Sequence, residues 1–569
     1  ALAGAIYIRT RDPSFDSDFR VRAEVADADT YQLSLAGGGT LVEDKIAFRL
    51  SADYRESEGF IDNTFLGQPA DESELQNFRA KLLFTPTDNL SIVTTTTYAE
   101  NFAGEDIVPI QPNDEIIDQV AYNADGREGT ETFLQAVNLK WDISESWSFQ
   151  SITTFQSTDY VRVEDFDVSP APIAELDRTG DDEAFSQEFR LRFDGDRFDG
   201  IFGFYYVDTE DSFDDEFIIP ASFLNPAIPP TLLIERQSVF AQEAENFAFF
   251  FDGEYAISDR FSVLFGARYD NEETSETSTA TTTFLSAIPP GFEFLLAFEG
   301  TESASTSADF DAFLPKIGVQ WAATDNTNVA FVVQRGYRAG GSELSIVDGT
   351  PVDYDPEFLT NYELSTRSLL LDGALAINAN IFFSDWEDQQ VPVPFDPNVP
   401  ELTRTVNAGE SSLQGLEIEF DYRAGGNLDL YGSLGYVESE FEDFPLIDPG
   451  TGIETNLSGN SFPFAAEWSA NLGFSKFHTA GIFYGVDINY RDEVFTTNEN
   501  QAFNVVPERT LVNARIGYEF QDNYRVTVYA RNLFDDDNIQ FLNRQAADQV
   551  GTARFGNPQL FGVRFDAVF

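Results

Sequence analysis

The stretch Val512–Phe520 reads Val-Asn-Ala-Arg-Ile-Gly-Tyr-Glu-Phe, so apolar and polar residues alternate along it. A β-strand turns successive side chains to opposite faces, which gives such a segment one apolar and one polar face. The alternation recurs at Phe48–Arg55, Phe78–Phe84, Phe189–Phe193 and Phe561–Phe569. We count about 22 candidate strands, whereas no stretch approaches the roughly 18 uninterrupted apolar residues of a transmembrane helix.

The connections between candidate strands alternate between tight and long. The tight ones are rich in Gly, Asn and Asp, as at Val42–Lys45, Asp372–Gly373 and Gln521–Asn523. The long ones lie roughly at 57–74, 101–130, 159–182, 210–242, 272–308, 339–358, 388–403, 440–461, 492–506 and 535–555. Short periplasmic turns and long outer loops are typical of outer-membrane barrels. The sequence therefore predicts an all-β fold, a transmembrane antiparallel β-barrel of about 22 strands with short periplasmic turns and long extracellular loops.

A soluble all-β protein, such as a sandwich array or a propeller, is the alternative. Such proteins also alternate, but they do not sort their loops into a short and a long set. The chain shows no fixed repeat of the roughly 40–50 residues that a propeller blade needs. The barrel is therefore favoured, and it predicts that the many aromatic residues form an outward belt against lipid.

The composition excludes several function classes. Among 569 residues there are 98 Asp and Glu against 34 Lys and Arg, one His and no Cys. A net charge of −64 argues against nucleic acid as a partner, because affinity for a polyanion comes mainly from Lys and Arg. Without Cys, and with His478 alone in a predicted periplasmic turn, the usual catalytic triads and multi-histidine metal sites are not available. We expect no enzyme and no resident cofactor.

Several motifs together resemble a known family. Gly4–Thr10, Leu41–Arg49, Asn407–Gly409 with Gly415–Glu419, Ala530–Asp535 and the ending Gly562–Phe569 occur in the order and at the spacing seen in TonB-dependent receptors of Gram-negative outer membranes. Tyr354–Glu357 followed by Asn361–Leu364 resembles a mid-barrel motif of the same family. The resemblance runs almost from end to end, although each motif alone is weak.

The resemblance implies a domain division, partners and a function. Residues 1–13 would be the C-terminal end of the plug domain and residues 14–569 the barrel; without more of the plug, a barrel of this size would be an open pore. The implied partners are the TonB energy-transducing complex, acting through the plug, the barrel-assembly machinery, and lipopolysaccharide with outer-membrane lipid. Phe569 would be the assembly signal, or simply the end of a lipid-facing strand. The implied function is import of a scarce nutrient, by default a ferric siderophore.

Candidate ligand contacts lie in Pro-rich apolar stretches of the outer loops. These stretches are Ile107–Ile110, Pro220–Ile234, Phe284–Phe298 and Val391–Phe395. Either they form an exposed apolar binding site, which favours a hydrophobic or amphiphilic siderophore, or they fold onto each other and bury their own apolar groups. The candidate binding residues are Ile228, Pro229, Ile288, Pro289, Phe292, Arg335, Tyr337, Arg338 and Phe395.

Charged residues have two interpretations each. Arg and Lys predicted to face inward, including Arg49, Lys81, Arg268, Arg335 and Arg515, either guide an anionic substrate or pair with acids across the wall and with the plug. Arg is sparse in the loops, so we do not expect an Arg-lined pocket for a multiply anionic chelate. Acidic clusters at 181–183, 211–216 and 535–537, placed in outer loops, either bind Ca²⁺ or are solvated surface charge.

Two other functions stay open from the sequence. The barrel could be a structural or interaction subunit whose apolar loops dock a surface lipoprotein or a second chain. It could also be a passive, porin-like channel.

Overall fold

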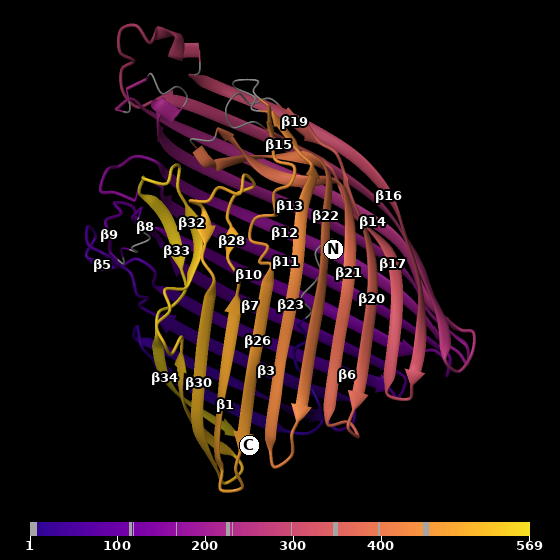
Figure 1. Cartoon of the computed structure of the whole chain (residues 1–569). Coiled ribbons are helices and arrows are strands. Elements are labelled where there is room, and N and C mark those ends of the chain that lie inside the picture. The colour runs from indigo at the N-terminus through magenta and orange to yellow at the C-terminus, as the bar shows by residue number, and fades with distance from the viewer. Residues whose placement is uncertain are drawn as a thin grey trace.

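The computed structural model describes residues 8–112, 117, 119–166, 168–223, 228–229, 231–297, 299–344, 351–396, 399–447 and 454–569. Its main feature is one 22-stranded antiparallel sheet that closes on itself (Figure 1). The strands of this sheet are β1 (Asp18–Ala26), β2 (Thr30–Val42), β3 (Ile46–Ser57), β6 (Ser73–Thr87), β7 (Leu90–Gly104), β10 (Arg127–Asp142), β11 (Trp147–Asp165), β12 (Glu175–Asp194), β13 (Phe198–Pro220), β14 (Leu233–Ala256), β15 (Phe261–Phe284), β16 (Gly300–Thr324), β17 (Thr327–Arg338), β20 (Glu357–Leu370), β21 (Leu375–Asp396), β22 (Val399–Arg423), β23 (Leu428–Asp443), β26 (Trp468–Phe477), β27 (Ile482–Arg491), β30 (Arg509–Phe520), β31 (Tyr524–Arg531) and β34 (Leu560–Val568). The predicted fold and strand number are confirmed.

Short elements lie in the connections at the outer end of the barrel. They are β4 (Asp62–Asn63), β5 (Gln68–Pro69), β8 (Ile107–Ile110), β9 (Gln119–Val120), β18 (Gly341–Leu344), β19 (Pro351–Tyr354), β24 (Pro445–Ile447), β25 (Glu454–Asn456), β28 (Val494–Phe495), β29 (Val505–Val506), β32 (Ile539–Asn543), β33 (Gly551–Phe555) and the 3-10 helices η1 (Ala221–Phe223) and η2 (Glu293–Ala297). No helix in the described part of the chain has both the length and the apolar character needed to cross a membrane.

The first and last strands close the barrel. β1 pairs with β34 from Arg20 opposite Val568 to Ala26 opposite Gly562. Beyond the last pair, Phe19 and Phe569 exchange two backbone hydrogen bonds, with N···O distances of 3.0 and 2.8 Å. Their rings also stack, with centroids 6.3 Å apart. Phe569 therefore holds the first and last strands together at the periplasmic end of the barrel.

The tight turns lie where the sequence predicts them. Connections such as those between β2 and β3 and between β30 and β31 contain two to four residues and lie at the periplasmic end of the barrel. The connection between β1 and β2 is equally short, at three residues, but it lies at the outer end. Asp44, Asp372 and Asp522 adopt positive φ angles of 57°, 56° and 57° in these turns, which short polar side chains tolerate best. His478 begins the turn that joins β26 to β27, as expected.

The outward face shows how far the lipid reaches. On β15 the outward residues from Phe261 to Tyr269 are mainly apolar, and they pair with outward Trp321 to Phe313 on β16. From Asn271 onward, opposite Asp311, the outward residues of both strands are polar. Because the period of a strand is two, this change marks the outer boundary of the lipid-facing belt. The aromatic residues line this belt, as the composition suggests.

Carboxylates follow directly above the belt on strand after strand. These exposed residues, which we call the acidic collar, are Glu56, Glu100, Glu131, Glu183, Glu245, Glu273, Asp311, Glu387, Glu438 and Glu508. Tyrosines at the top of the belt donate hydrogen bonds to several of them: Tyr54 to Glu56 at 2.8 Å and Tyr206 to Glu245 at 2.9 Å. The collar concentrates negative charge at the level where lipid meets water.

Several predicted loops are in fact strands. β11 to β16 continue far above the lipid, so only residues 166–174, 221–232 and 285–299 connect them, instead of 159–182, 210–242 and 272–308 (Figure 1). Likewise β21 extends to Asp396 and β22 begins at Val399, and both of these residues lie within the predicted loop 388–403. Above the lipid both faces of a strand meet water, so the apolar alternation that marks a strand disappears although the ladder continues. The acidic residues 181–183 and 211–216 lie in β12 and β13, and their placement in loops is wrong.

The inner wall pairs its charges. Arg49 contacts Asp18 at 2.7 Å, Arg268 contacts Asp270 at 2.6 Å, and Arg515 contacts Asp487 at 2.9 Å. Lys81 contacts Asp12 at 2.8 Å, which holds the segment before β1 against the wall. The interpretation as paired wall charge is confirmed for these residues. The assignment of residues 1–13 to a plug stays a prediction, and residues 1–7 lie outside the described part.

The outer connections have an apolar core of their own. Val108 and Ile110 of β8 pack with Tyr122, Leu542 and Ala553, all fully or almost fully buried. β8, β32 and β33 form a three-stranded sheet here, which ties the connection after β7 to the one before β34. We call this assembly the loop cap.

Glu105 is a buried acid at the margin of the loop cap. It is 8% exposed and directly precedes the ion pair of Asp106 with Arg554, whose atoms are 2.7 Å apart. Burial, together with the nearby charge of Glu164, raises the pKa of Glu105 to about 8. Glu105 is therefore protonated in the folded cap at neutral pH.

Deleting Phe569 should weaken the barrel more than replacing it with Ala. Phe569→Ala keeps both backbone bonds to Phe19, whereas deletion removes them, at about 1 kcal/mol for each bond. Urea unfolding in lipid vesicles measures the difference, and Phe561→Ala, on the same strand and lipid face, is the control. Equal losses for deletion and Ala would assign the effect to the ring alone.

The loop cap should lose stability as pH rises. The unfolded carboxyl ionises near 4.5 and the folded one near 8, so the folded cap holds an extra proton between these values. Local stability therefore falls by up to about 1.4 kcal/mol per pH unit in this window and levels off above it. Hydrogen exchange at the β8 and β33 amides measures this, and Glu105→Gln should flatten the slope by about one proton. An unchanged slope in the variant contradicts the assignment.

Candidate ligand-binding cavity

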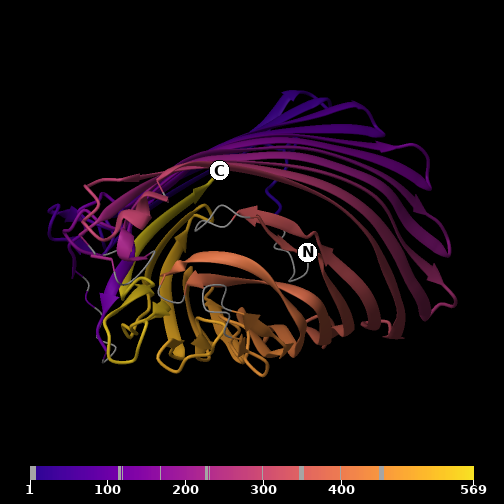
Figure 2. The ribbon, with the colours of Figure 1, turned by 90° about the horizontal axis from the view of Figure 1, so that it is seen from above.

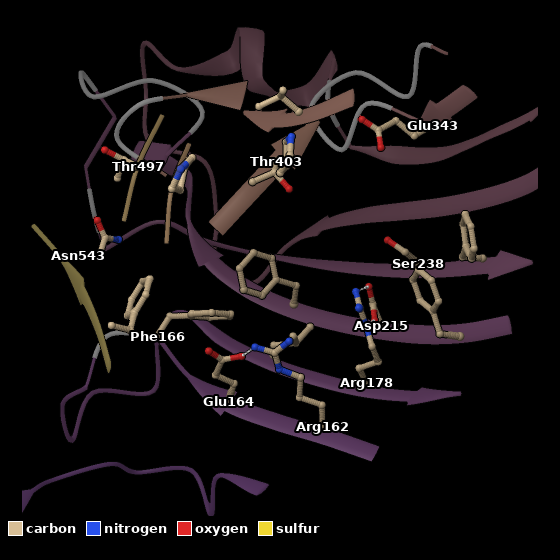
Figure 3. A pocket seen from close by; sticks show the side chains of 18 of the residues that line it. Arg162, Glu164, Phe166, Arg178, Asp215, Ser238, Glu343, Thr403, Thr497 and Asn543 are labelled. Atoms are coloured by element: carbon tan, nitrogen blue, oxygen red, sulfur yellow. Dashed lines mark hydrogen bonds and ion pairs between the residues drawn. The ribbon is translucent and has the colours of Figure 1, made fainter. Parts of the chain in front are cut away.

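The main cavity lies inside the mouth of the barrel and has a volume of about 1010 Å³ (Figure 3). One side is the inner face of β11 to β16 above the lipid. The other side comes from the outer ends of β21 and β22 and from the connections after β23, β27 and β31. Seen from above, these later elements lie across the mouth from the extended strands β11 to β16, which we call the tall wall (Figure 2).

Strand register arranges charged and polar side chains in a row on the tall wall. Arg162, Arg178, Asp215 and Ser238 lie directly opposite one another on β11, β12, β13 and β14. Arg178 holds Asp215 through two hydrogen bonds of 2.5 and 2.6 Å and lies 4.3 Å over the ring of Phe213. Bidentate pairs of this kind fix geometry as well as charge. Arg178 is therefore fully engaged within the wall.

Aromatic rings flank this row. Phe213 and Phe240 stack with centroids 4.5 Å apart, and Phe166 meets the edge of Phe217 at 5.7 Å. Across the cavity, Phe441 and Phe462 lie 4.8 Å apart. The cavity therefore offers flat apolar surfaces on both sides, which suit a ligand with aromatic or other apolar groups.

Arg236 differs from the other arginines of the cavity. Arg162 pairs with Glu164, and Arg554 pairs with Asp106. Arg236 lies between Phe217 and Thr282 in register, and its buried Nε has no hydrogen-bond partner. Burial lowers the pKa of its guanidinium, which Glu302 partly offsets. Among the described residues that line the cavity, Arg236 is the arginine without an ion pair, so it can bind an anionic ligand group.

Hydrogen bonds between connections hold the far side of the cavity in place. Asn498 donates to the carbonyl of Pro392 at 2.9 Å and accepts from Asn460 at 2.8 Å through its own carbonyl. Trp386 and the amide of Gln390 donate to buried Glu357 at 3.2 and 2.6 Å. The surface formed by Phe462 and Gln390 is thus organised before any ligand arrives.

The apolar candidates of the sequence analysis lie mainly in their own small core. Ile228 is 2% exposed and packs with Leu232, Ile234 and Leu295, with Ile288 and Phe292 against them. Pro229 and Pro289 lie in the same two connections, and none of these proline or isoleucine candidates lines the cavity. The interpretation in which these loops bury their own apolar groups describes this cluster. Phe294 and Leu296 of η2 remain 54% and 55% exposed.

The remaining candidates lie apart from one another. Arg335 is on the outward face, where it pairs with Glu387 at 3.1 Å and lies 4.1 Å over Phe358, so its predicted inward orientation is wrong. Arg335 is two positions after outward Val333 on the same strand, so it faces the same side. Tyr337 packs on Phe358 at 5.3 Å, and Arg338 contacts Glu357 at 3.5 Å. The side chain of Phe395 lies outside the described part. Ligand contact by these residues stays a prediction.

The cavity arginines were not among the binding residues predicted from the sequence. Arg is sparse in the predicted loops, yet Arg162, Arg178, Arg236 and Arg554 meet in one cavity. The signal was present: Phe213, Asp215 and Phe217 share one strand parity, as do Arg236, Ser238 and Phe240. Because these stretches were predicted to be loops, no strand parity was assigned to their residues. Within the described residues, no three Asp, Glu or His side chains are arranged to hold a metal ion.

Comparisons with known proteins agree with this architecture. The family model for the TonB dependent receptor-like β-barrel matches residues 63–533. The chain is 24% identical to the pesticin receptor of Yersinia pestis over 434 residues, covering 74% of this chain and 57% of that protein. It is 24% identical to the metal-pseudopaline receptor CntO of Pseudomonas aeruginosa over 294 residues, covering 52% and 37%. The chain thus spans less than two thirds of the length of these curated relatives.

Solved structures share the fold. The ferric yersiniabactin uptake receptor FyuA from Yersinia pestis superposes with a TM-score of 0.82 at 18% identity, covering 98% of this chain and 81% of that chain. The ferric-catecholate import receptor Fiu from Escherichia coli K12 superposes with a TM-score of 0.74 at 15% identity, covering 98% and 83%. With a family match over most of its length, the chain belongs to the TonB-dependent receptor β-barrels, a family of receptors and not of enzymes, and it is a barrel of the Gram-negative outer membrane.

Proposed function

We propose that this barrel is the uptake receptor for a ferric siderophore that carries aromatic or other apolar groups and few negative charges. The observation that carries the proposal is the cavity, which combines aromatic surfaces with Arg236, the arginine that has no ion pair among the described lining residues and whose Nε is buried. A highly anionic chelate would need several free cations, whereas the other three cavity arginines already hold acids. Similar proteins are named for ferric yersiniabactin and for ferric catecholates.

The proposed transport step depends on the TonB complex. We take residues 1–13 as the end of a plug domain that contacts this complex, and residues 14–569 as the barrel through which the ligand passes. Uptake of labelled iron chelate by cells that express the receptor should stop when TonB is deleted, while surface binding persists. Uptake that continues without TonB favours the porin-like alternative and contradicts the proposal.

Trp386 provides a direct measure of ligand binding. Its ring lies 6.2 Å from Phe462, which lines the cavity, whereas Trp141, Trp147, Trp321 and Trp468 are on the lipid-facing side. A ferric chelate in the cavity should quench Trp386, and Trp386→Phe should remove this signal. We expect quenching by ferric yersiniabactin or a ferric catecholate at concentrations where ferric citrate gives none. Quenching by ferric citrate alone contradicts the proposed ligand class.

Replacing Arg236 should weaken this binding. A charge-assisted hydrogen bond contributes about 1.5–3 kcal/mol, so Arg236→Gln should raise Kd by roughly 10- to 100-fold. Arg236→Lys keeps the charge and should recover part of the affinity. Arg260→Gln, in a periplasmic turn, is the matched control and should leave Kd unchanged. Equal affinity of Arg236→Gln and the native chain removes Arg236 from the site.

A further inference from the structure

A group of polar side chains faces the lipid on one wall of the barrel. On β7, β10, β11 and β12 the outward residues include a set that we call the polar stripe: Thr94, Thr96, Gln135, Ser151, Thr153 and Gln187. Their direction follows from register, because they alternate with inward residues and share parity with exposed Trp141, Phe133, Phe155 and Phe189. Figure 1 shows these four strands side by side.

The polar stripe lies within the belt and not at its edge. On β11, Ser151 and Thr153 stand between Trp147 and Phe155, which mark the two ends of the lipid-facing segment. At comparable distances from the periplasmic turns, the outward residues of β13, β14 and β16 include Phe202, Phe249 and Ile317. Polar groups that face hydrocarbon are unfavourable unless a partner satisfies them. This wall therefore differs from the rest of the belt in what it can contact.

The hydrogen bonds of the stripe leave unused capacity. Thr96 donates to Gln135 Oε1 at 2.6 Å, and Thr153 donates to Gln187 Oε1 at 2.7 Å. Gln187 Nε2 has three acceptors at 3.1 Å, Ser151 Oγ and two backbone carbonyls. The contact of Gln135 Nε2 with the carbonyl of Ala136 is long, at 3.4 Å. Gln135 thus retains a donor, and the Gln and Thr oxygens retain acceptor lone pairs.

We propose that the polar stripe is the contact surface for a second copy of this chain in the membrane. A two-fold axis along the membrane normal keeps every residue at its own depth, so the stripe of one copy meets the stripe of the other by construction. The spare donor of Gln135 then faces the acceptors of the partner's stripe. A surface that carries both donors and acceptors is self-complementary in this arrangement, whereas a lipid chain offers neither.

An apolar hollow continues the same surface toward the periplasm. Leu90, Leu139, Trp141, Ile143 and Phe149 line it, and its volume is about 500 Å³. In a two-fold pair it lies opposite residues of the same depth on the partner, among them the exposed ring of Trp147. The contact thus combines apolar packing with the paired polar groups above it.

Cross-linking tests the proposal cleanly because the chain contains no Cys. We would place one Cys on the stripe, Ser151→Cys, and one on the opposite wall, Leu472→Cys, in the otherwise native chain. In vesicles at low protein density, a short bis-maleimide should link Ser151→Cys into dimers at least ten times more than Leu472→Cys. Adding Gln135→Leu and Gln187→Leu should reduce the link to the Leu472→Cys level, whereas Thr366→Leu, a polar lipid-facing change elsewhere, should not.

Each other outcome overturns the proposal. Equal linking at both positions means random collision, and no linking at Ser151→Cys means that the stripe faces lipid. Linking that survives both Gln substitutions means that the polar groups are not the cause. A link in native membranes to a different protein, instead of to this chain, replaces the second copy by another partner. Heat modifiability on gels verifies that every variant is folded, so a lost link is not a lost barrel.

Discussion

A sheet inside a membrane cannot have an edge, because lipid offers no hydrogen bonds to unpaired backbone groups. The pairing of β1 with β34 satisfies this constraint, and everything else in the structure depends on it. It requires an unbroken ladder around the whole ring, which fixes the register of each strand against the next. Register in turn decides which side chains face lipid, which face the lumen, and at what depth.

The same pairing of strands continues above the lipid, and there it forms one wall of the cavity. β11 to β16 extend past the acidic collar, and their register carries Arg162, Arg178 and Asp215 to one level of the inner wall. The wall supplies a rigid half of the site, while hydrogen-bonded connections such as that of Asn498 with Pro392 supply the other half. A receptor mouth made mainly of strand can hold a cavity of about 1010 Å³ without long free loops.

The fold was predictable because lipid imposes alternation on segments such as Val512–Phe520, and tight turns such as Asp372–Gly373 punctuate it. The cavity was not predictable in the same way. Above the lipid the outward residues of β13 and β14 are mainly polar, and the inward ones mix Phe213, Phe217 and Phe240 with charged residues. The apolar alternation is therefore lost and the strands look like loops, and the sequence around Arg236 does not indicate which residues it contacts. The burial of Ile228 against Leu295 depends on two connections far apart in sequence, which alternation alone does not bring together. Arg335 was predicted to face inward, but the preceding residues Val329–Val333 are apolar at every position, so alternation does not decide which face Arg335 occupies.

The acidic collar has a consequence for the rate at which ligands arrive. A ring of carboxylates around the mouth creates a negative potential that extends roughly 8 Å into water at physiological ionic strength and farther in fresh water. A ferric complex of high negative charge is slowed before it touches any binding residue, whereas a neutral or weakly charged complex diffuses in unhindered. The barrel therefore selects among chelates by their approach as well as by their fit, and the salinity of the surroundings sets how strict that selection is.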